Sequence, residues 1–301
     1  MGPLDREKLQ RLQQRARIIQ SIRAFFIARD FLEVETPQRI PQNAPEPHIH
    51  PIASGNWQLQ TSPELAMKRL LAAGSGPIFQ ISHCWRDEER GRRHLPEFTL
   101  LEWYRPQADY RDLMTDCEDL LRHLCPADRI ETTGRQVDLS APFERLSVDQ
   151  AFARYSACSA QQALAEDRFD ELLAFDIEPH LGNARPTFLY DYPAELAALS
   201  RPKPGHPELA ERFELYVAGY ELANAFSELT DPREQRRRFE ADVEAIRARG
   251  GTVRQLPEPF LAALETMPSA AGIALGVDRL VMLLTAADHI DQIVAFPPET
   301  L

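Results

Sequence analysis

The chain has 301 residues, of which 44% are hydrophobic and 27% charged, a composition typical of one globular protein. Acidic residues outnumber basic ones by 46 to 34, and the formal net charge of -12 argues against a large nucleic-acid interface, which would need clustered basic residues. No apolar run approaches the ~20 residues of a membrane helix, and residues 1–20 lack the pattern of a signal segment, so we expect a cytoplasmic protein with no membrane partner.

The first half of the chain alternates helical and strand patterns. Leu9, Ile19 and Phe26 lie at helical spacing, and period-two alternation follows until Pro37 ends it. The predicted elements, in chain order, are a helix at 10–29, a strand at 31–36, an extended surface segment at 45–50 within the proline-containing stretch 38–56, a helix at 63–73, strands at 78–85 and 98–104, a helix at 110–124, and a hairpin or loop at 126–145.

The second half continues in the same way, with Ser147 as a predicted helix N-cap. Neither half contains a repeat or a clear linker, and the simplest prediction is one α+β domain over residues 1–301. The predicted elements are a helical region at 147–173, a strand at 187–192, a mobile loop at 200–207, strands at 213–217 and 221–226, helices at 232–249 and 257–266, a strand at 271–275 and a helix at 277–285.

Four cysteines are present, and none of them belongs to a Cys-x-x-Cys pair. No group of His and Cys residues has zinc-binding spacing either. We therefore interpret the cysteines as reduced thiols without a metal. They are Cys84, Cys117, Cys125 and Cys158.

The segment 78–105 has the most specific chemistry, because a strand ends in charged residues and a second strand follows a Gly-containing loop. Arg86 offers a planar donor fork for a phosphate. Glu88 can accept from an amine, and Phe98 offers a flat face for a base. Taken alone, the run could equally be a solvated charged hairpin. Further phosphate charge could be neutralised by Arg90, Arg92 and Arg93.

The segment 271–284 places small residues just before an arginine. Gly272, Ala274 and Gly276 would let the backbone approach a ligand closely. Arg279 then begins an apolar helix and must emerge from a buried stretch. A helix-start arginine paired with an acid is the alternative, but glycines this close to a strand end favour a ligand site.

These two segments, preceded by the helix and strand that end at Pro37, have the order and content of the three class II aminoacyl-tRNA synthetase motifs. The resemblance runs from about residue 10 to the end of the chain. Three more segments resemble the substrate pocket of lysyl-tRNA synthetase, namely 61–64, 101–104 and 221–231.

Lysyl-tRNA synthetase carries an anticodon-binding OB-fold domain before its catalytic domain, whereas here the first motif begins close to residue 1, so we expect no such domain. The chain is therefore similar to the EpmA/GenX/PoxA family, bacterial ligases that attach a lysine, preferentially (R)-β-lysine, to a lysine side chain of translation elongation factor P. Ala274 agrees, because lysyl-tRNA synthetases usually have glycine there and this family has alanine.

The resemblance implies an α+β catalytic domain with a mostly antiparallel sheet of about six strands flanked by helices. It also implies a homodimer with the first motif at the interface, and the use of ATP and Mg²⁺. Activation is attack by the substrate carboxylate on the α-phosphate, which needs positioning and charge stabilisation rather than a protein nucleophile. The implied ATP-binding residues are Arg86, Asp87, Glu88, His94, Leu95, Phe98, Glu221, Leu222, Gly276 and Arg279.

Individual roles follow from the same resemblance. Arg86 and Arg279 are the implied catalytic residues that hold the phosphates, and Phe98 stacks on adenine. Glu214 and Glu221 are the implied Mg²⁺ ligands. A buried ammonium would be held by Glu102, Tyr104 and Glu228, the amino group by Glu64 and the carboxylate by Asn224. The implied substrate-binding set is Ser62, Glu64, Glu102, Tyr104, Asn224, Glu228 and Ala274.

Some residues depart from the family pattern. Leu95 stands where asparagine is usual, which removes one side-chain contact to the nucleotide, and Ala225 replaces a frequent glycine. We assign no base for the transfer step. The surface histidines are expected to be His48, His50 and His206.

Two other functions remain open. One is a minimal lysyl-tRNA synthetase paralogue that charges tRNA, which the negative charge and the expected lack of an OB-fold disfavour. The other is a non-catalytic synthetase-like regulator. The presence of both arginines and of the acids at 214, 221 and 228 disfavours that second reading.

Overall fold

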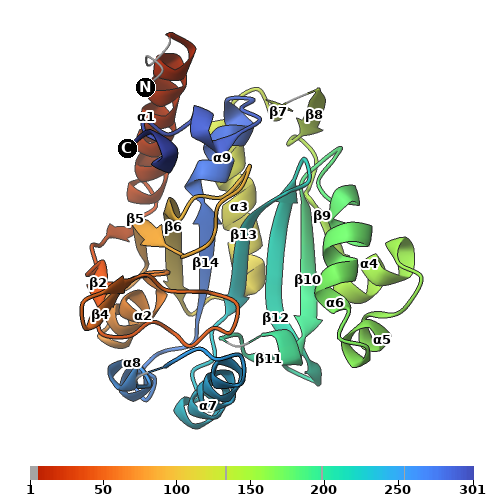
Figure 1. The fold of residues 1–301 in the computed structure, drawn as a ribbon. Helices are drawn as coiled ribbons and strands as arrows, with labels where there is room; N and C mark the ends of the chain where they lie inside the picture. Colours follow the sequence, from red (N-terminus) through yellow and green to blue (C-terminus); the bar gives the residue numbers. More distant parts are fainter. Residues whose placement is uncertain (1–5, 133, 198, 254) are drawn as a thin grey trace.

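A curved β-sheet forms the middle of the molecule (Figure 1). The structure is a computed structural model that describes residues 6–132, 134–197, 199–253 and 255–301. In this part of the chain the sheet has nine strands, in the order β1-β5-β6-β14-β13-β12-β10-β9, with β11 paired to β12. The strands are β1 (Leu32–Glu33), β5 (Ile78–Trp85), β6 (Glu97–Pro106), β9 (Glu144–Ser147), β10 (Thr187–Pro193), β11 (Pro202–Lys203), β12 (His206–Val217), β13 (Tyr220–Ser227) and β14 (Ala270–Gly276).

The helices surround this sheet, and side-chain caps define where several of them begin. The Asp109 carboxylate accepts from two backbone N–H groups at the start of α3, and Asp231 does the same before Pro232 at the start of α7. The helices are α1 (Arg6–Ile27), α2 (Glu64–Ala72), α3 (Tyr110–Leu124), α4 (Val148–Tyr155), α5 (Ala160–Ala165), α6 (Phe169–Leu172), α7 (Pro232–Ala248), α8 (Glu258–Ala263) and α9 (Val277–Leu284).

The predicted α+β class is confirmed, and most neighbouring strands are antiparallel. The exceptions are the parallel pairs β1–β5 and β9–β10. The expectation of about six strands was too low, because β9 and β11 have four and two residues, which is too short for an alternating pattern to appear in the sequence.

Three predicted elements differ in the structure. The helical region 147–173 is broken, because Ser159 begins a new helix with its own capping box to Gln162. The predicted strand 31–36 is regular only over β1, although Val34 N–H still bonds to the Phe79 carbonyl at 2.9 Å. The loop 200–207 is a hairpin in which β11 pairs with the start of β12.

Two smaller sheets lie outside the main one. The stretch 38–56 contributes two strands to a three-stranded sheet in the order β2-β4-β3, and the predicted extended segment 45–50 lies between these two strands. The predicted hairpin within 126–145 is confirmed as the β7–β8 pair. These strands are β2 (Arg39–Ile40), β3 (Ala53–Ser54), β4 (Trp57–Leu59), β7 (Arg129–Thr132) and β8 (Arg135–Asp138).

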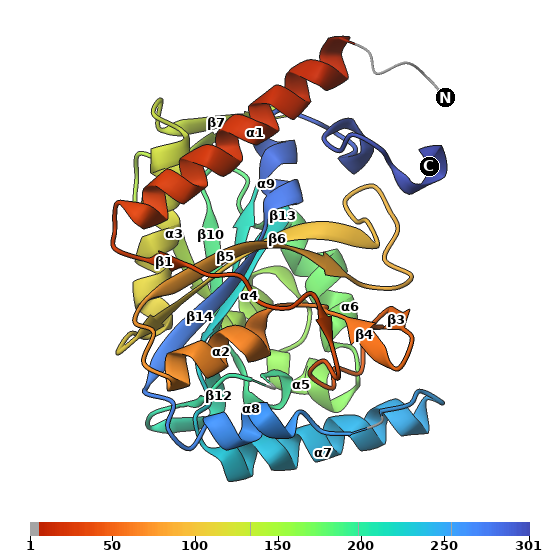
Figure 2. The same ribbon diagram turned by 90° about the vertical axis from the view of Figure 1, so that its left-hand side faces the viewer.

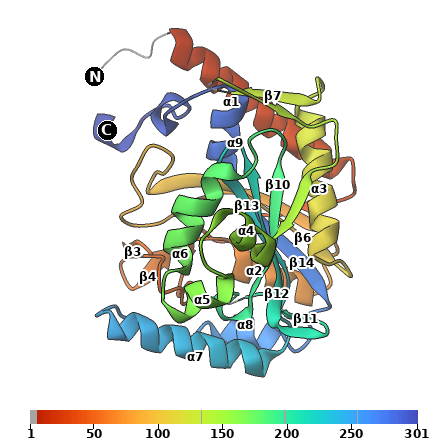
Figure 3. The same cartoon turned by 90° about the vertical axis from the view of Figure 1, so that its right-hand side faces the viewer.

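Hydrophobic packing fixes the helices around the sheet. Figure 2 shows α1 crossing above α9 and α3, and their apolar side chains form one core with the sheet. Figure 3 shows α4, α5 and α6 beside β10 and β12, where a second core forms. A third core joins α2 and α8 to the end of β6. Among the described residues no helix has the length and apolar character that a membrane crossing requires.

A buried polar network ties α1 to the start of α9. The Asp278 carboxylate accepts from Arg15 at 2.5 Å and from the Thr99 backbone N–H at 2.7 Å. Arg15 also donates to the Thr99 hydroxyl at 2.9 Å. Since Asp278 directly precedes Arg279, this network fixes the position from which the Arg279 side chain extends from α9.

Candidate active site

The central strands present one face to the core and the other face to a cavity. Trp103, Ile273 and Ala225 pack into the core with α1, α3 and α9. Their neighbours Glu102 and Ala274 line the cavity. Side chains alternate between the two faces of a strand, so one sheet supports both the fold and the site.

Strand register sets the order of residues along the cavity. In one row across the sheet, Glu102 pairs with Ala274 and Ala274 pairs with Asn224. Asn224 in turn pairs with Glu214. Four residues that are far apart in sequence therefore become direct neighbours, with Ala274 between the predicted ammonium-binding and carboxylate-binding residues.

The adjacent row explains Gly272. Tyr104 pairs with Gly272, and Gly272 pairs with Phe226. A Cβ atom added to Gly272 would lie 2.2 Å from Tyr104 Cε1 and 2.4 Å from Glu228 Oε1. The missing side chain therefore makes room for two neighbouring side chains, whereas the sequence suggested close approach of the backbone to a ligand.

Arg86 and Phe98 form one wall at the end of the cavity nearest the β5–β6 loop. The Arg86 guanidinium carbon lies 5.1 Å from the centre of the Phe98 ring. Arg86 Nε is buried and has no hydrogen-bond partner among the described residues, and its Nη1 lies 3.5 Å from Glu89. A flat ring beside an unpaired guanidinium donor suits a base and a phosphate.

Arg279 faces this wall, held by two partners. Its Nη1 donates to the Glu221 carbonyl at 2.8 Å and lies 3.2 Å from the Glu221 carboxylate. Its Nη2 lies 2.5 Å from His94 Nε2. Burial, and then the charge of Arg279, lower the pKa of His94, so the neutral imidazole accepts from the arginine. Leu222 and Gly276 line the same end.

Two predicted nucleotide contacts, Asp87 and Glu88, do not line the cavity. Glu88 has a φ of 65°, and its carboxylate points outward to within 3.4 Å of His50. The Asp87 backbone N–H donates to the His50 carbonyl at 2.7 Å. These residues therefore join the loop to the segment that contains His50, a residue whose predicted exposure is confirmed. Leu95 does line the cavity, and it is also part of the core.

The side chains at the opposite end of the cavity are acidic and buried. Glu102 is fully buried and accepts from the Ser62 hydroxyl at 2.6 Å and from the Tyr104 hydroxyl at 2.7 Å. Burial, and then the charge of Glu64, raise the pKa of Glu102 to about 7. An ammonium group would reverse this shift by favouring the ionised carboxylate.

A lysine of the protein itself lies beside these acids. Lys68 Nζ is 2.5 Å from Glu64 Oε1 and forms a second ion pair with Glu228 Oε2. Glu228 Oε1 is buried without a hydrogen-bond partner in the described part of the chain. Burial raises the pKa of Glu228 to about 8, although Lys68 opposes this. Glu228 thus keeps one free acceptor atom behind the cavity wall.

Asn224 is oriented by a partly buried arginine, Arg212, whose side chain is 18% exposed. Its side-chain oxygen accepts from Arg212 Nε at 3.1 Å, and Arg212 also bonds to the Leu196 carbonyl at 2.6 Å. Since the oxygen of Asn224 is occupied, its amide N–H₂ group faces the cavity as a donor. A donor at this position suits a carboxylate.

Glu178, Glu214 and Glu221 form an acid cluster beside the nucleotide end. Burial, and then the charge of Glu214, raise the pKa of Glu221, and burial likewise raises the pKa of Glu178. The Glu214 carboxylate lies outside the cavity lining and accepts from Arg212 at 2.6 Å, from Tyr192 at 2.6 Å and from Tyr216 at 2.7 Å.

The acid cluster alone does not provide a complete set of ligands for a magnesium ion. Among the described residues, no three His, Cys, Asp or Glu side chains are placed to hold a metal by themselves. Mg²⁺ usually takes one or two carboxylates and completes its shell with phosphate and water oxygens. Glu221 and Glu214 therefore fit the ion only in company with a bound phosphate.

Comparison with known proteins identifies the fold. A family model described as tRNA synthetases class II (D, K and N) matches residues 4–300. The chain belongs to this family.

Several similar proteins are elongation factor P–(R)-β-lysine ligases. The chain is 42% identical over 305 residues to that of Edwardsiella ictaluri, covering 95% of this chain and 94% of the relative. It is 42% identical over 306 residues to that of Proteus mirabilis, with 95% and 94% covered. It is 43% identical over 308 residues to that of Sodalis glossinidius, with 96% and 95% covered. The resemblance found in the sequence, to a class II fold and to this group of ligases, is confirmed.

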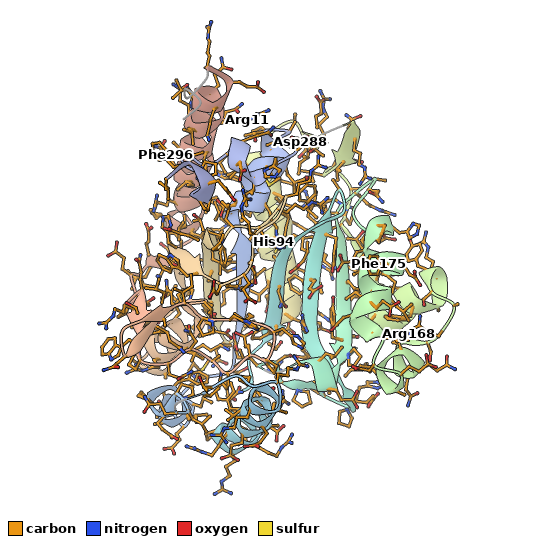
Figure 4. The ribbon with its side chains drawn as sticks, in the orientation of Figure 1. Arg11, His94, Arg168, Phe175, Asp288 and Phe296 are labelled. Atoms are coloured by element: carbon orange, nitrogen blue, oxygen red, sulfur yellow. The ribbon has the colours of Figure 1, made fainter. Side chains whose placement is uncertain are left out.

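Two arginines of the β5–β6 loop of this class II domain, Arg90 and Arg92, already have acidic partners. Arg90 lies 2.8 Å from Glu299 and 2.9 Å from Asp291. Arg92 donates to the Asp288 carbonyl at 2.6 Å. Figure 4 shows His94 over the middle of the sheet and Asp288 beside α9. Acids of the C-terminal segment therefore neutralise these two arginines.

Arg93, in the same loop, lies on the tip of the β12–β13 hairpin. Its guanidinium carbon is 3.8 Å from the centre of the Tyr220 ring, and it donates to the Gly219 carbonyl at 3.0 Å. Arg93 also lines the cavity. The expectation that three loop arginines neutralise phosphates therefore retains structural support for Arg93 alone.

Three residues that lie at or beside the cavity were not singled out from the sequence, namely Lys68, Arg212 and Glu46. Lys68 carried a signal, because it falls on the apolar face of α2 between Met67 and Leu71, where a lysine needs a partner. Arg212 and Glu46 carried none. Glu46 lines the cavity from the segment that was predicted to be on the surface, and burial raises its pKa to about 7 although the charge of Arg86 opposes this.

Proposed function

We propose that this protein uses ATP to activate a lysine, with (R)-β-lysine as the substrate, and transfers it to a lysine side chain of translation elongation factor P. The observation that carries the proposal is the acidic end of the cavity, where Glu102 and Glu228 are buried within a class II synthetase fold. Buried acids need a cation. Three similar proteins are named as ligases of (R)-β-lysine and elongation factor P.

The nucleotide end of the cavity supports the activation step. In our proposal Phe98 stacks on adenine, and Arg86 and Arg279 bind the phosphates and stabilise the charge that develops at the α-phosphate. The substrate carboxylate forms a bond to that phosphorus as the bond to pyrophosphate breaks. Arg279 must then exchange His94 or Glu221 for the nucleotide, because both occupy its donors here.

The other end supports the choice of amino acid. The Asn224 amide holds the substrate carboxylate near Arg86, and Glu64 takes the nearer ammonium. Glu102 and Glu228, with Tyr104, take the distal ammonium. An uncharged side chain would leave these acids without a counter-ion in a dry site, so it should be rejected strongly.

A magnesium ion, when bound, would neutralise phosphate charge. Glu221 and Glu214 would hold it, together with phosphate oxygens. Arg212, Tyr192 and Tyr216 donate to the Glu214 carboxylate and hold it in one orientation. This carboxylate would therefore meet such an ion in a fixed orientation.

Transfer of the lysyl group needs an amine at the mouth of the cavity. The acceptor amine attacks the acyl carbon, AMP leaves, and the amine loses a proton. A protein lysine is our proposed acceptor, and the neutralised loop argues against RNA, because Arg90 and Arg92 already have acidic partners and phosphate binding needs free cations.

Three further properties complete the proposal. We propose that residues 1–301 act as one catalytic domain and that two copies associate through α1 and β1. Ile27 and Leu32 support this, because they are large apolar residues with more than half of their surface exposed, at 58% and 55%. We place the reaction in the cytoplasm, where elongation factor P works. A monomeric mass by light scattering at micromolar concentration would contradict the dimer.

ATP–pyrophosphate exchange tests the activation step. Lysine or (R)-β-lysine should support exchange and norleucine should not. A non-catalytic regulator would give no exchange with any amino acid. A tRNA-charging paralogue would give exchange but would then load tRNA instead of elongation factor P.

A further inference from the structure

Lys68 is a buried charged residue beside the acidic end of the cavity, and the proposed reaction has given it no role. It lies on α2, and 1% of its side chain is exposed. Its ammonium contacts Glu64 and Glu228. It therefore forms a permanent link between two acids that are also proposed to bind substrate ammonium groups.

The surroundings of Lys68 keep it charged and fixed. Its ammonium lies 5.0 Å from the centre of the Phe226 ring and 5.9 Å from that of Phe260, and aromatic faces attract cations. Burial lowers the pKa of Lys68, but Glu228 and Glu64 more than offset this and the pKa is raised. Water has almost no access to this ammonium.

The charges at this end can be counted. Three acids, Glu64, Glu102 and Glu228, face one cation. Glu102 is bound by the neutral hydroxyls of Ser62 and Tyr104, which supply no charge. When all three acids are ionised, two negative charges are left without a counter-ion.

We propose that Lys68 is a specificity-determining residue, whose fixed ammonium cancels one of the three carboxylates so that the cavity matches a substrate with two ammonium groups. A lysine or β-lysine brings two ammonium groups and leaves no excess charge. An amino acid with one ammonium group leaves one buried carboxylate unpaired, which is costly. This inference rests on the proposed function and adds the residue that sets the required charge.

Other titratable groups also lie near these acids. Glu46 and Arg86 line the same cavity; burial raises the pKa of Glu46, the charge of Arg86 opposes this and the charge of Glu64 adds to it, so we count Glu46 with Arg86 as an opposite pair that adds no net charge. The Cys84 thiol is buried behind Glu102, and burial raises its pKa. The Tyr104 hydroxyl donates to Glu102 and its pKa is raised well above the usual value, so both groups stay neutral.

The test compares Lys68→Met with a charge-balanced double variant, Lys68→Met with Glu64→Gln. Pyrophosphate exchange is measured with lysine and with norleucine, which lacks the distal ammonium. Lys68→Met should lower kcat/KM for lysine at least about tenfold without lowering the lysine-to-norleucine ratio of kcat/KM, because one carboxylate then stays unpaired even when both ammonium groups of lysine are bound. It should also move the rise of 1/KM for lysine to higher pH, since the acids lose their fixed cation.

The double variant should keep the ratio within about threefold of the wild type, because one cation and one acid are removed together. It also remains informative if the single variant fails to fold, since its buried charge is balanced. A Lys68→Met variant with the wild-type kcat/KM for lysine and the wild-type pH profile, or a double variant that does not discriminate lysine from norleucine, would overturn the proposal. No lysine-dependent exchange in the wild type would instead overturn the proposed function.

Discussion

The two ends of the cavity differ in burial and in how their charges are satisfied. At the acidic end, the side chains of Lys68 and Glu228 are 1% and 0% exposed; Lys68 lies on α2, and Glu228 directly follows β13. At the nucleotide end, the side chains of Arg86 and Arg279 are 26% and 23% exposed. One guanidinium has a donor without a partner, and the other bonds to groups it must release.

Because of this difference, the acidic end can select the amino acid, whereas the nucleotide end can adjust its contacts as the nucleotide binds and leaves. Buried charges on rigid elements cannot relax, so the acidic end discriminates by the cost of leaving a charge unpaired. Arg86 and Arg279 are partly exposed and can change partners at little cost. This suits a nucleotide that enters and leaves in every cycle. Changes at the acidic end should therefore have the larger effects.

The largest effect is expected from Glu228→Gln. This change removes the negative charge of Glu228 and leaves Lys68 with one acid, and breaking a buried pair costs ~3–5 kcal/mol. We expect kcat/KM for lysine in pyrophosphate exchange to fall by about 1000-fold, with ATP affinity unchanged. Glu211→Gln is the matched control, because Glu211 is a buried acid paired with Arg201 on the same sheet. Undiminished exchange would show that the pocket has been misplaced.

Gly272→Ala should have the next largest effect. The added methyl would collide with Tyr104 and Glu228, and displacing groups that position a substrate by about 1 Å can cost roughly 100-fold in rate. We expect a loss of that size in kcat/KM for lysine. Gly91→Ala is the control, since its Cβ would meet only His94 Nδ1, at 4.0 Å. Equal activity of the two variants would contradict the close packing at Gly272.

The pH dependence of lysine binding distinguishes the two ends without a mutation. The pKa values of Glu102 and Glu228 are raised to about 7 and about 8 in the empty site. A bound ammonium favours the ionised acids, so binding releases protons. KM for lysine should then fall by about tenfold between pH 6.5 and 8.5. KM for ATP should change little, because the pKa of His94 is lowered. A lysine KM that is flat or rises with pH would contradict this assignment.

The smallest effect is expected from Arg90→Ala. Arg90 lies in the loop over the nucleotide end, but its guanidinium is already paired with Glu299 and Asp291 at the surface. Exposed ion pairs contribute ~0–1 kcal/mol. KM for ATP should change by less than about threefold. A loss of tenfold or more would instead place Arg90 on the phosphates.

Much of the nucleotide and acidic ends could be predicted because the motifs keep their order in the sequence. Glu102, Ala274 and Asn224 were singled out separately, and strand register makes them neighbours. Gly272 was noticed for its size, although its neighbours turned out to be side chains. The core and the cavity follow from the same alternation, which is visible in a sequence.

The predictions that differ from the structure concern loop residues, because the directions of their side chains depend on the loop backbone. Glu88 points away from the cavity because its backbone turns with φ 65°, which a motif does not reveal. Glu46 enters the cavity because the Asn43 side chain fastens its segment to Thr61 and Gln58. Arg90 finds its partner, Glu299, 209 positions away, and no local pattern predicts such a pairing.

The acceptor assay tests the central claim most directly. Purified protein, ATP, Mg²⁺ and either α-lysine or (R)-β-lysine would be mixed with elongation factor P or with lysine tRNA, with Glu228→Gln as the blank. Our account predicts that elongation factor P gains the mass of one lysyl unit, more readily with (R)-β-lysine, and that tRNA stays uncharged. Charged tRNA with elongation factor P unmodified would contradict it.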